Sequence, residues 1–313
     1  MNQPARKMRS AHCPSAVLMI RPHHFYVNPQ TRKDNVFQRD PVGMSPEQVS
    51  ASARRELSTA AKKLEAAGIH VHIFEDEGTE TPDSVFPNNW FSTHAGGHIA
   101  IYPMLAKARR EERRADVIEM LKTKYRVQDV IDYSGLEPDG LFLEGTGAMV
   151  LDHIDRVAYA AKSKRTDPIA LERFCTHFNF EPIVFRAADA NDVPIYHTNV
   201  LMCIATSFVM IGLDMISDQE RRREIVERFE SSGREVIALD DAQIGNFAGN
   251  AIELQGAQQR ILAISSRALQ ALRKDQIDII GQSAQILPLD IPTIELSGGS
   301  VRCTLAGIHL SPR

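Results

Sequence analysis

Short apolar runs recur along the chain at a nearly constant interval. Each run is rich in β-branched residues and is followed by a turn, a second apolar run and, in four of the five cases, a charged segment with helical periodicity. The interval between successive runs stays between 50 and 58 residues. The runs occupy 69–74, 127–131, 181–185, 235–239 and 285–289. This layout predicts five repeated units of strand, strand, helix and strand.

The amphipathic segments between the turns carry start and stop signals of helices. Residues 45–48 (Ser-Pro-Glu-Gln) read as an N-cap, a first-turn proline and a capping-box glutamine, and Gly68 ends this helix. Residues 217–220 form a second capping box, for a helix that ends at Gly233. Further helices are expected over 106–125, 167–178 and 266–282.

A single unit of this kind cannot bury both faces of its small sheet. Several units placed side by side, with the helices outside, solve this problem. The N-terminal strand at 16–20 would complete the last unit and close five units into a ring. We therefore expect an α/β fold in which the five units surround a common axis.

Six polar or reactive residues follow the repeat at equal spacing. Successive members are 53 to 55 residues apart. In a closed ring, equivalent turns point toward the axis, so these side chains would meet at one central cavity. Asn and Gly are common in turns because of their backbone preferences alone. This simpler explanation fits Asn250 but does not fit Cys303. The six residues are Asn35, Asn89, Glu144, His197, Asn250 and Cys303.

Composition and charge narrow the classes of function. The 313 residues are 43% apolar and 24% charged, which excludes disordered and fibrous classes. A formal charge of −4 without a basic stripe argues against a nucleic-acid partner. The apolar run at 16–20 is too short for a signal peptide or a membrane span. A cytoplasmic protein that does not bind membranes is therefore expected.

The spacing of the four cysteines argues against structural roles, so chemical reactivity is the property that would distinguish one of them. Cys13, Cys175, Cys203 and Cys303 include no Cys-x-x-Cys pair, which fits neither a disulfide framework nor a zinc site. Cys303 follows residues 297–300 (Ser-Gly-Gly-Ser), whose glycines allow close approach to a ligand and leave N–H groups for developing negative charge. We interpret Cys303 as a nucleophile and the other three as buried, inert thiols.

His197 and Glu144 lie on the same spacing and carry chemistry that complements a thiol. The imidazole of His197 can donate a proton to a leaving amine and then take one from water. Glu144 opens a Glu-Gly-Thr-Gly turn that lacks the third glycine of a dinucleotide-binding loop. Its carboxylate can instead accept N–H groups of a nitrogen-rich substrate.

Two other features of the sequence receive simpler interpretations. His94 and His98 have the spacing of metal ligands, but no third ligand accompanies them, so no metal site is expected. The charged run at 109–114 (Arg-Arg-Glu-Glu-Arg-Arg) is interpreted as a solvated helix face.

The five-unit repeat, Glu144, His197 and a Gly-Gly-Ser-x-x-Cys motif that ends at Cys303 resemble the guanidino-group-modifying (amidinotransferase, or pentein) superfamily. The resemblance covers the chain after the first ten or so residues. It implies a five-bladed α/β propeller of ββαβ units with helices outside. The propeller would form a single catalytic domain over 1–313 with a flexible N-terminus at 1–12.

The resemblance also implies roles for the three reactive residues. Cys303 would attack the central carbon of a guanidine or urea, His197 would act first as general acid and then as general base, and Glu144 would hold substrate N–H groups. No metal or organic cofactor is expected, because the thiol supplies covalent catalysis.

Two departures from arginine deiminases favour citrulline over arginine. Those enzymes carry aspartates where this sequence has Asn89, in the motif 86–90 (Phe-Pro-Asn-Asn-Trp), and Asn199, in His-Thr-Asn. A guanidinium is cationic and only donates, so it suits carboxylates, whereas a neutral ureido group has a carbonyl acceptor and suits an amide. The motif 86–90 and the Asn28-Pro29 and Asn35-x-Phe-Gln motifs resemble most closely the citrulline-utilising hydrolases of the superfamily.

The expected activity is hydrolysis of citrulline to ornithine, ammonia and carbon dioxide through an S-carbamoyl cysteine. The alternatives are an arginine dihydrolase or deiminase, an amidinotransferase, and a non-catalytic amino-acid-binding protein on the same fold. The expected partner is a small amino-acid substrate, and a homodimer is allowed.

Arg165 aligns with an arginine that holds the substrate α-carboxylate in deiminases, the alternative being an exposed arginine at a strand end. The expected substrate-binding residues are Asn28, Asn35, Asn88, Asn89, Asn199 and Arg165, beside the catalytic Cys303, His197 and Glu144.

Overall fold

The structure is a computed structural model that describes residues 12–313 as a mixed α/β fold. Within these residues the strands form five sheets of three strands each. The expectation of a flexible terminus at 1–12 falls mostly on residues 1–11, which lie outside the described residues; His12 is buried, with Nε2 2.8 Å from the carbonyl oxygen of Ile204. None of the described helices combines the length and the apolar character needed to cross a membrane.

Four sheets share one layout. The central strand pairs antiparallel with the strand before it and parallel with the strand after it. A parallel pair needs a crossover connection, and helices supply it here. The sheets are β3 (Phe91–His94), β4 (His98–Ile101) and β5 (Asp129–Asp132); β6 (Met149–Asp152), β7 (Val157–Ala161) and β8 (Glu181–Phe185); β9 (Met202–Ile204), β10 (Phe208–Ile211) and β11 (Glu235–Ala238); and β12 (Ile252–Gln255), β13 (Arg260–Ser265) and β14 (Gln285–Leu289).

The fifth sheet joins segments from both ends of the described chain. Its central strand, β1 (Ala16–Pro22), pairs parallel with β2 (His70–Asp76) and antiparallel with β15 (Ala306–Gly307). The unit that begins near the N-terminus is therefore completed by a strand near the C-terminus, which agrees with the closure expected from the sequence.

A helix or a pair of helices connects each central strand to its parallel neighbour. α1 (Pro46–Ala66) begins after Ser45, and the capping box with Gln48 is confirmed, because each side chain bonds to the backbone N–H of the other residue. The second predicted N-cap, Ser217, is wrong by one residue. α7 (Gln219–Ser231) starts after Asp218, whose carboxylate accepts from two N–H groups of the first turn.

Two predicted helices are interrupted. The range 106–125 contains α2 (Lys107–Arg110) and α3 (Ala115–Lys124), and the range 266–282 contains α9 (Ser266–Ala271) and α10 (Lys274–Gly281). The third predicted helix forms as α5 (Pro168–Phe178). The apolar core is divided into four clusters between the sheets and these helices, and the largest cluster joins residues of three neighbouring sheets.

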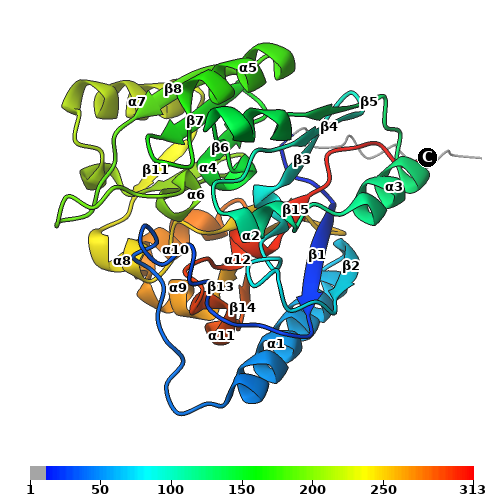
Figure 1. The fold of residues 1–313 in the computed structure, drawn as a ribbon. Helices are drawn as coiled ribbons and strands as arrows, with labels where there is room; N and C mark the ends of the chain where they lie inside the picture. Colours follow the sequence, from blue (N-terminus) through cyan, green and yellow to red (C-terminus); the bar gives the residue numbers. More distant parts are fainter. Residues whose placement is uncertain (1–11) are drawn as a thin grey trace, which may run out of the picture.

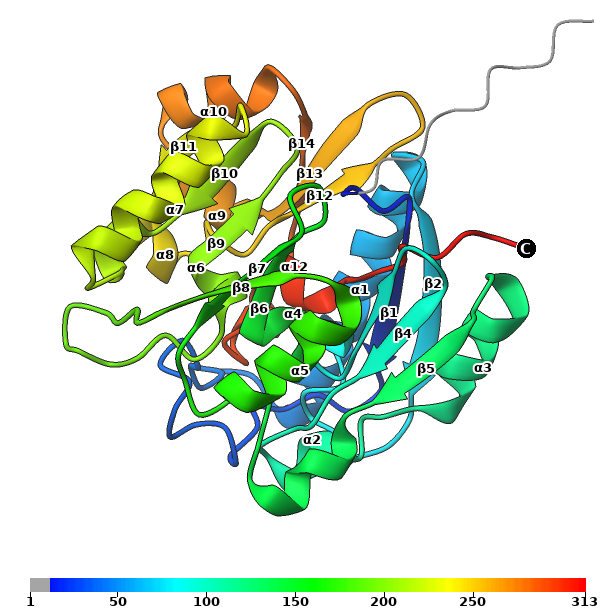
Figure 2. The same ribbon diagram turned by 90° about the horizontal axis from the view of Figure 1, so that it is seen from above.

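A single helical turn precedes four of the five antiparallel edge strands, and these turns gather near the middle of the molecule. α4 contacts both α6 and η1, and α12 contacts η1. In both views α4, α6 and α12 lie centrally, whereas α3 and α7 lie outside (Figures 1 and 2). The central turns are η1 (Pro87–Asn89), α4 (Gly145–Ala148), α6 (Thr198–Leu201) and α12 (Val301–Thr304), and shorter connections elsewhere form η2 (Ser134–Asp139), η3 (Leu213–Met215), α8 (Asp241–Gly245) and α11 (Pro292–Glu295).

One cavity is bordered by the antiparallel edge strands of all five sheets. Its lining includes Thr93 of β3, Val150 of β6, Cys203 of β9, Glu253 of β12 and Ala306 of β15. Each sheet thus directs the same one of its three strands toward a shared space, and the central turns lie at the beginning of these strands.

Candidate active site

A second, smaller cavity lies where the central turns meet. Residues from six separated parts of the chain line it, so the fold alone brings them together. Four of the equally spaced residues found in the sequence belong to this lining. The lining consists of Thr31, Asn35, Asp83, Phe86, Asn89, Arg109, Arg165, Tyr196, His197, Ser297, Gly299 and Cys303.

Cys303 lies on α12 with its sulfur held by two amides. The side-chain nitrogens of Asn199 and Asn250 are each 3.2 Å from Sγ, and both residues are buried. The Asn250 amide is fixed in turn, because Nδ2 also donates to the Asn199 carbonyl at 2.8 Å and Oδ1 accepts from the Cys303 N–H at 3.4 Å. Neutral N–H donors directed at a sulfur stabilise negative charge that develops there.

His197 and Glu144 form a buried pair. His197 Nε2 is 2.9 Å from Glu144 Oε2. Burial lowers the pKa of His197 to about 4, although the hydrogen bond to Glu144 opposes this shift. Burial by itself would raise the pKa of Glu144, but Arg165, His197 and Arg109 hold that pKa well below its usual range. The pair therefore consists of a neutral imidazole and a carboxylate at neutral pH.

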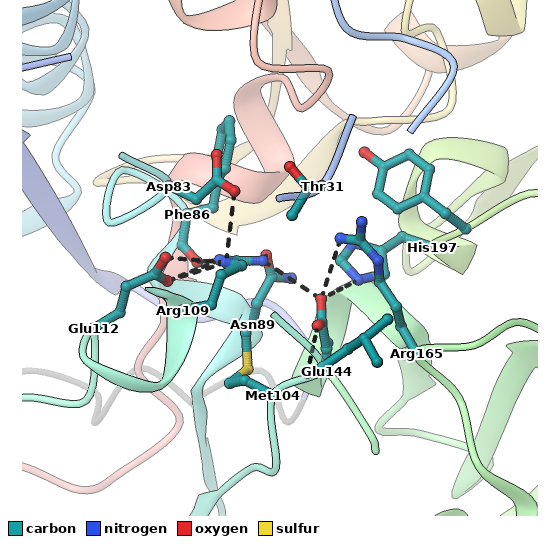
Figure 3. A network of polar contacts seen from close by, with 12 residues as sticks. Thr31, Asp83, Phe86, Asn89, Met104, Arg109, Glu112, Glu144, Arg165 and His197 are labelled. Carbon is teal, nitrogen blue, oxygen red and sulfur yellow. Dashed lines mark hydrogen bonds and ion pairs between the residues drawn. The ribbon is translucent and has the colours of Figure 1, made fainter. Parts of the chain in front are cut away.

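The Glu144 carboxylate is surrounded by protein donors (Figure 3). Its Oε1 accepts from the Leu105 N–H at 3.1 Å. Its Oε2 accepts from His197 and, at 3.4 Å each, from Arg109 and Arg165. These donors come from three connections, those between β4 and β5, β7 and β8, and β8 and β9, so Glu144 orients several parts of the site at once.

Arg109 is the centre of a second group of buried charges (Figure 3). Its guanidinium bonds to Glu112 at 2.9 Å and to the Asn89 side-chain oxygen at 3.0 Å, and it lies 3.9 Å from Asp83. Burial opposes the charged form, but the three carboxylates around it keep the pKa of Arg109 above its usual value. The interpretation of the run 109–114 as a solvated helix face is therefore wrong for Arg109 and Glu112, which are 2% and 3% exposed.

The two asparagines of the Asn-Asn motif face different ways. Asn89 lines the cavity, and its Nδ2 is buried with no hydrogen-bond partner in the described chain. Asn88 bonds instead to Thr146 and is not part of the cavity lining. Gly147 makes this packing feasible, because a Cβ atom there would lie 2.1 Å from Asn89 Nδ2 and 2.8 Å from His197 Nδ1.

The remaining predicted binding residues divide between lining and support. Asn35 lines the cavity and donates to the Ser297 carbonyl at 3.2 Å. Asn28 lies outside the lining and donates to Asp83 at 2.8 Å. Asn199 Oδ1 is buried, with no hydrogen-bond partner within residues 12–313.

Arg165 is buried, so the alternative of an exposed arginine at a strand end is wrong. Its guanidinium lies over the Tyr196 ring, 4.9 Å from the centroid, and bonds to Asp34 at 2.8 Å and to Glu144. Tyr196, which sequence reasoning did not select, donates its hydroxyl hydrogen to the Gly298 carbonyl.

The other three cysteines and the two histidines with metal-ligand spacing lie outside the lining of this cavity. Cys13, Cys175 and Cys203 are buried, and the Cys13 thiol donates to Glu253 Oε2 at 2.8 Å. Within the part of the chain that the structure describes, no three His, Cys, Asp or Glu side chains are grouped so that they could hold a metal ion. His94 and His98 face each other across β3 and β4, and each bonds to a neighbouring side chain instead, Ser92 and Asp129.

Comparison by sequence gives one family. The model of the N,N-dimethylarginine dimethylhydrolase family, eukaryotic, matches residues 21–310. No curated protein matches the sequence.

Comparison by structure gives several similar chains. The N-terminal domain of ArgZ, an arginine dihydrolase of the ornithine-ammonia cycle in cyanobacteria, has a TM-score of 0.71 at 16% identity, over 94% of this chain and 97% of that one. Unliganded AgrE has a TM-score of 0.73 at 19% identity, over 95% of this chain and 40% of that one. A dimethylarginine dimethylaminohydrolase adduct with S-methyl-L-thiocitrulline has a TM-score of 0.63 at 13% identity, over 94% and 99%. At these identities the structures establish a shared fold.

Proposed function

The chain belongs to the eukaryotic N,N-dimethylarginine dimethylhydrolase family, within the guanidino-group-modifying superfamily, and from this premise we propose that it hydrolyses the ureido group of citrulline with Cys303 as the nucleophile. We also propose that its five sheets are the blades of an α/β propeller. Two observations support this arrangement: all five edge strands border one cavity, and β1 pairs with β15.

One observation carries the choice of a ureido substrate. Asn89 presents an unpaired amide donor, and Asn199 presents an unpaired amide acceptor beside the sulfur. An unmatched buried donor and an unmatched buried acceptor are costly unless a ligand pairs with both. A ureido group has one carbonyl acceptor and N–H donors, so it complements both amides, whereas a guanidinium offers donors alone.

The charged side chains of the lining are already paired with one another or with neighbouring carboxylates. They are Arg109, Arg165 and Asp83. Arg109 is bonded to Glu112 and lies 3.9 Å from Asp83, and Arg165 is bonded to Asp34. The choice of a ureido group therefore rests on the two amides.

The same charges suit the other end of an amino acid. We assign the α-carboxylate to Arg165, whose guanidinium matches a carboxylate in geometry. Asp83 can accept from the α-ammonium group, because its Oδ1 is buried and has no hydrogen-bond partner among the described residues. A substrate with both groups would span the cavity, its ureido end at Cys303.

The first half of the reaction forms the covalent intermediate. Neutral His197 takes the proton of the Cys303 thiol, and the sulfur adds to the ureido carbon while Asn89 donates to the oxygen. Glu144 keeps the resulting imidazolium oriented and stabilises its charge. His197 then protonates the δ-nitrogen, the carbon–nitrogen bond breaks, and ornithine leaves an S-carbamoyl group on Cys303.

The second half releases the carbamoyl group. His197, neutral again, removes a proton from water, and the hydroxide adds to the carbamoyl carbon. The carbon–sulfur bond breaks, the thiolate recovers the proton from His197, and the carbamic acid decomposes to ammonia and carbon dioxide.

Product analysis tests the proposal. Citrulline, arginine and N,N-dimethylarginine are supplied separately, and ornithine and citrulline are measured. We expect ornithine from citrulline, a carbamoyl adduct located at Cys303 by mass spectrometry, and loss of turnover in Cys303→Ala with substrate binding retained. Citrulline formed from either arginine compound, with no ornithine formed from citrulline, would reject the proposed substrate.

An arginine dihydrolase is the second candidate. Asp83 favours it, because its unpaired carboxylate oxygen can accept from a guanidinium whose central carbon lies at Cys303 in the same small cavity. The same thiol and imidazole would then act twice, first releasing ammonia and then ornithine. Ornithine formed from arginine in the same assay would support this candidate.

A further inference from the structure

The segment 23–45, between β1 and α1, covers the small cavity without forming a helix or a strand. Thr31 and Asn35 of this segment belong to the cavity lining. Asn35 ties the segment to the turn before Cys303 through Ser297, and the Arg39 N–H donates to the Leu296 carbonyl at 2.9 Å. Any substrate that reaches Cys303 therefore contacts this segment.

One carboxylate of the segment is bonded to the arginine that we assign to the substrate. Asp34 Oδ1 lies 2.8 Å from Arg165 Nη2, and Asp34 Oδ2 lies 3.4 Å from Nε of the same guanidinium. This two-point contact is the way in which a carboxylate usually binds an arginine. Arg165 is only 3% exposed, whereas the Asp34 side chain is 24% exposed.

We propose that Asp34 occupies the position of the substrate α-carboxylate in the empty enzyme and must be displaced from Arg165 by the α-carboxylate of an arriving substrate. This inference rests on the proposed function, because it takes the α-carboxylate to bind at Arg165. Asp34 is a competing group that sets specificity and does not touch the reacting atoms.

The exchange is physically easy for both partners. Arg165 keeps a carboxylate at Nη2 before and after the exchange, and Glu144 stays on Nη1, so no buried cation is left unpaired. Asp34 is already partly in solvent and lies in a connection free of sheet pairing, so its release needs no change in a strand or helix. A ligand without an α-carboxylate cannot displace Asp34 and would bind with the segment unchanged.

The test compares ligands that differ only in the carboxylate. Binding of L-citrulline and of carbamoylputrescine, which is citrulline without its α-carboxylate, is measured by calorimetry in the Cys303→Ala background. Removing the competing charge by Asp34→Asn is expected to tighten citrulline binding by about fivefold, with carbamoylputrescine unchanged. Asp34→Glu restores a carboxylate and should return citrulline affinity toward the starting value.

A matched control is present on the same segment. Asp40 pairs with Arg32 at the surface, so Asp40→Asn removes the same charge from the segment without touching Arg165. This variant should leave both affinities unchanged. In active enzyme, Asp34→Asn should lower the KM for citrulline and leave kcat nearly the same.

Two outcomes would overturn the inference. Weaker citrulline binding in Asp34→Asn would mean that Asp34 positions Arg165 for the ligand, and an equal shift for both ligands would mean a general effect on the segment.

The same comparison with L-arginine and agmatine separates this inference from the choice of substrate. A carboxylate-dependent gain for arginine alone would retain the role of Asp34 and reject the ureido substrate, whereas no such gain in either pair would reject the role of Asp34.

Discussion

The sulfur of Cys303 is held by two neutral amides, and this arrangement has a measurable consequence. Asn199 belongs to α6 and Asn250 lies in the loop before β12, yet each donates to Sγ. A carboxylate in place of either amide would destabilise a neighbouring thiolate by charge repulsion. The amide at Asn199 thus suits the nucleophile as well as a neutral substrate.

Asn250→Ala should weaken the nucleophile without emptying the cavity. Loss of a hydrogen bond to a charged group corresponds to about 1.5–3 kcal/mol, so kcat/KM should fall by about 10- to 100-fold. The rate of alkylation of Cys303 by iodoacetamide should fall. Asn246→Ala is the control, since that amide bonds to Ala242 and Arg267 instead. An unchanged alkylation rate would exclude a role of Asn250 at the sulfur.

The pH dependence should show a base that titrates unusually low. Burial lowers the pKa of His197 to about 4, so the imidazole of the free enzyme stays neutral well below pH 6.5. The acid limb of kcat/KM due to His197 should therefore lie near pH 4 to 5, and a midpoint near 6.5 would contradict it. The stability of the folded state depends on the same pKa. The unfolded state binds this proton near pH 6.5 and the folded state binds it only near pH 4, so His197 makes the folded state less stable as pH falls from 6.5 toward 4.

At this scale, sequence reasoning found the residues that lie on a regular spacing and missed those that do not. Glu144, His197 and Cys303 could be predicted because each occupies the same position in its unit. Arg109 and Asp83 could not, because their burial depends on how distant segments pack around them. A run of alternating charges looks the same in sequence whether one arginine faces solvent or the cavity.

Among the elements, the helix ranges were predictable and their interruptions were not. Residues 109–114, which contain the break between α2 and α3, are all charged and include neither Gly nor Pro, so the sequence has no stop signal there and tertiary contacts decide it. Arg109 of α2 turns inward to Asn89 and Asp83, and Glu112, beyond the end of α2, bonds to Arg109. The break is therefore part of the site.

The α4 turn should tolerate no side chain at Gly147. An added Cβ would lie 2.1 Å from Asn89 Nδ2 and 2.8 Å from His197 Nδ1, so Gly147→Ala must displace one of them. We expect kcat/KM to fall by about 100-fold or more, because small displacements of reacting groups have effects of this size. Gly281→Ala is the matched control, since nothing lies within 4 Å of its added Cβ. Full activity of Gly147→Ala would mean that this packing does not position the site.

For the whole molecule, the repeat predicted the number of sheets, and the expected closure into a ring stays part of the proposal. Equal spacing identified five units, and the sheet that joins β1 to β15 agrees with the expected ring. The strand order within that sheet was not predictable, because a two-residue strand at 306–307 has no periodicity of its own.

Removing residues 306–313 tests this closure. The deletion keeps Cys303, His197 and Glu144 but removes β15 and its pairing with Val17 and Leu18. We expect a lower thermal unfolding temperature and loss of turnover, because α12 would no longer be followed by a paired strand. The Ala306→Ser variant, which keeps the backbone pairing, should retain most of both properties. An active, equally stable truncated chain would show that the closing strand is dispensable.

The sheet that unites β1 with β15 also orders events during protein synthesis. The ribosome makes Ala16 long before Ala306, so one edge of β1 stays unpaired until β15 is made, although β2 can pair with its other edge much earlier. Cys303 emerges in the same stretch as β15. Under the proposed function, a nascent chain that still lacks this stretch also lacks its nucleophile, so the reactive thiol and the last pairing of β1 become available together.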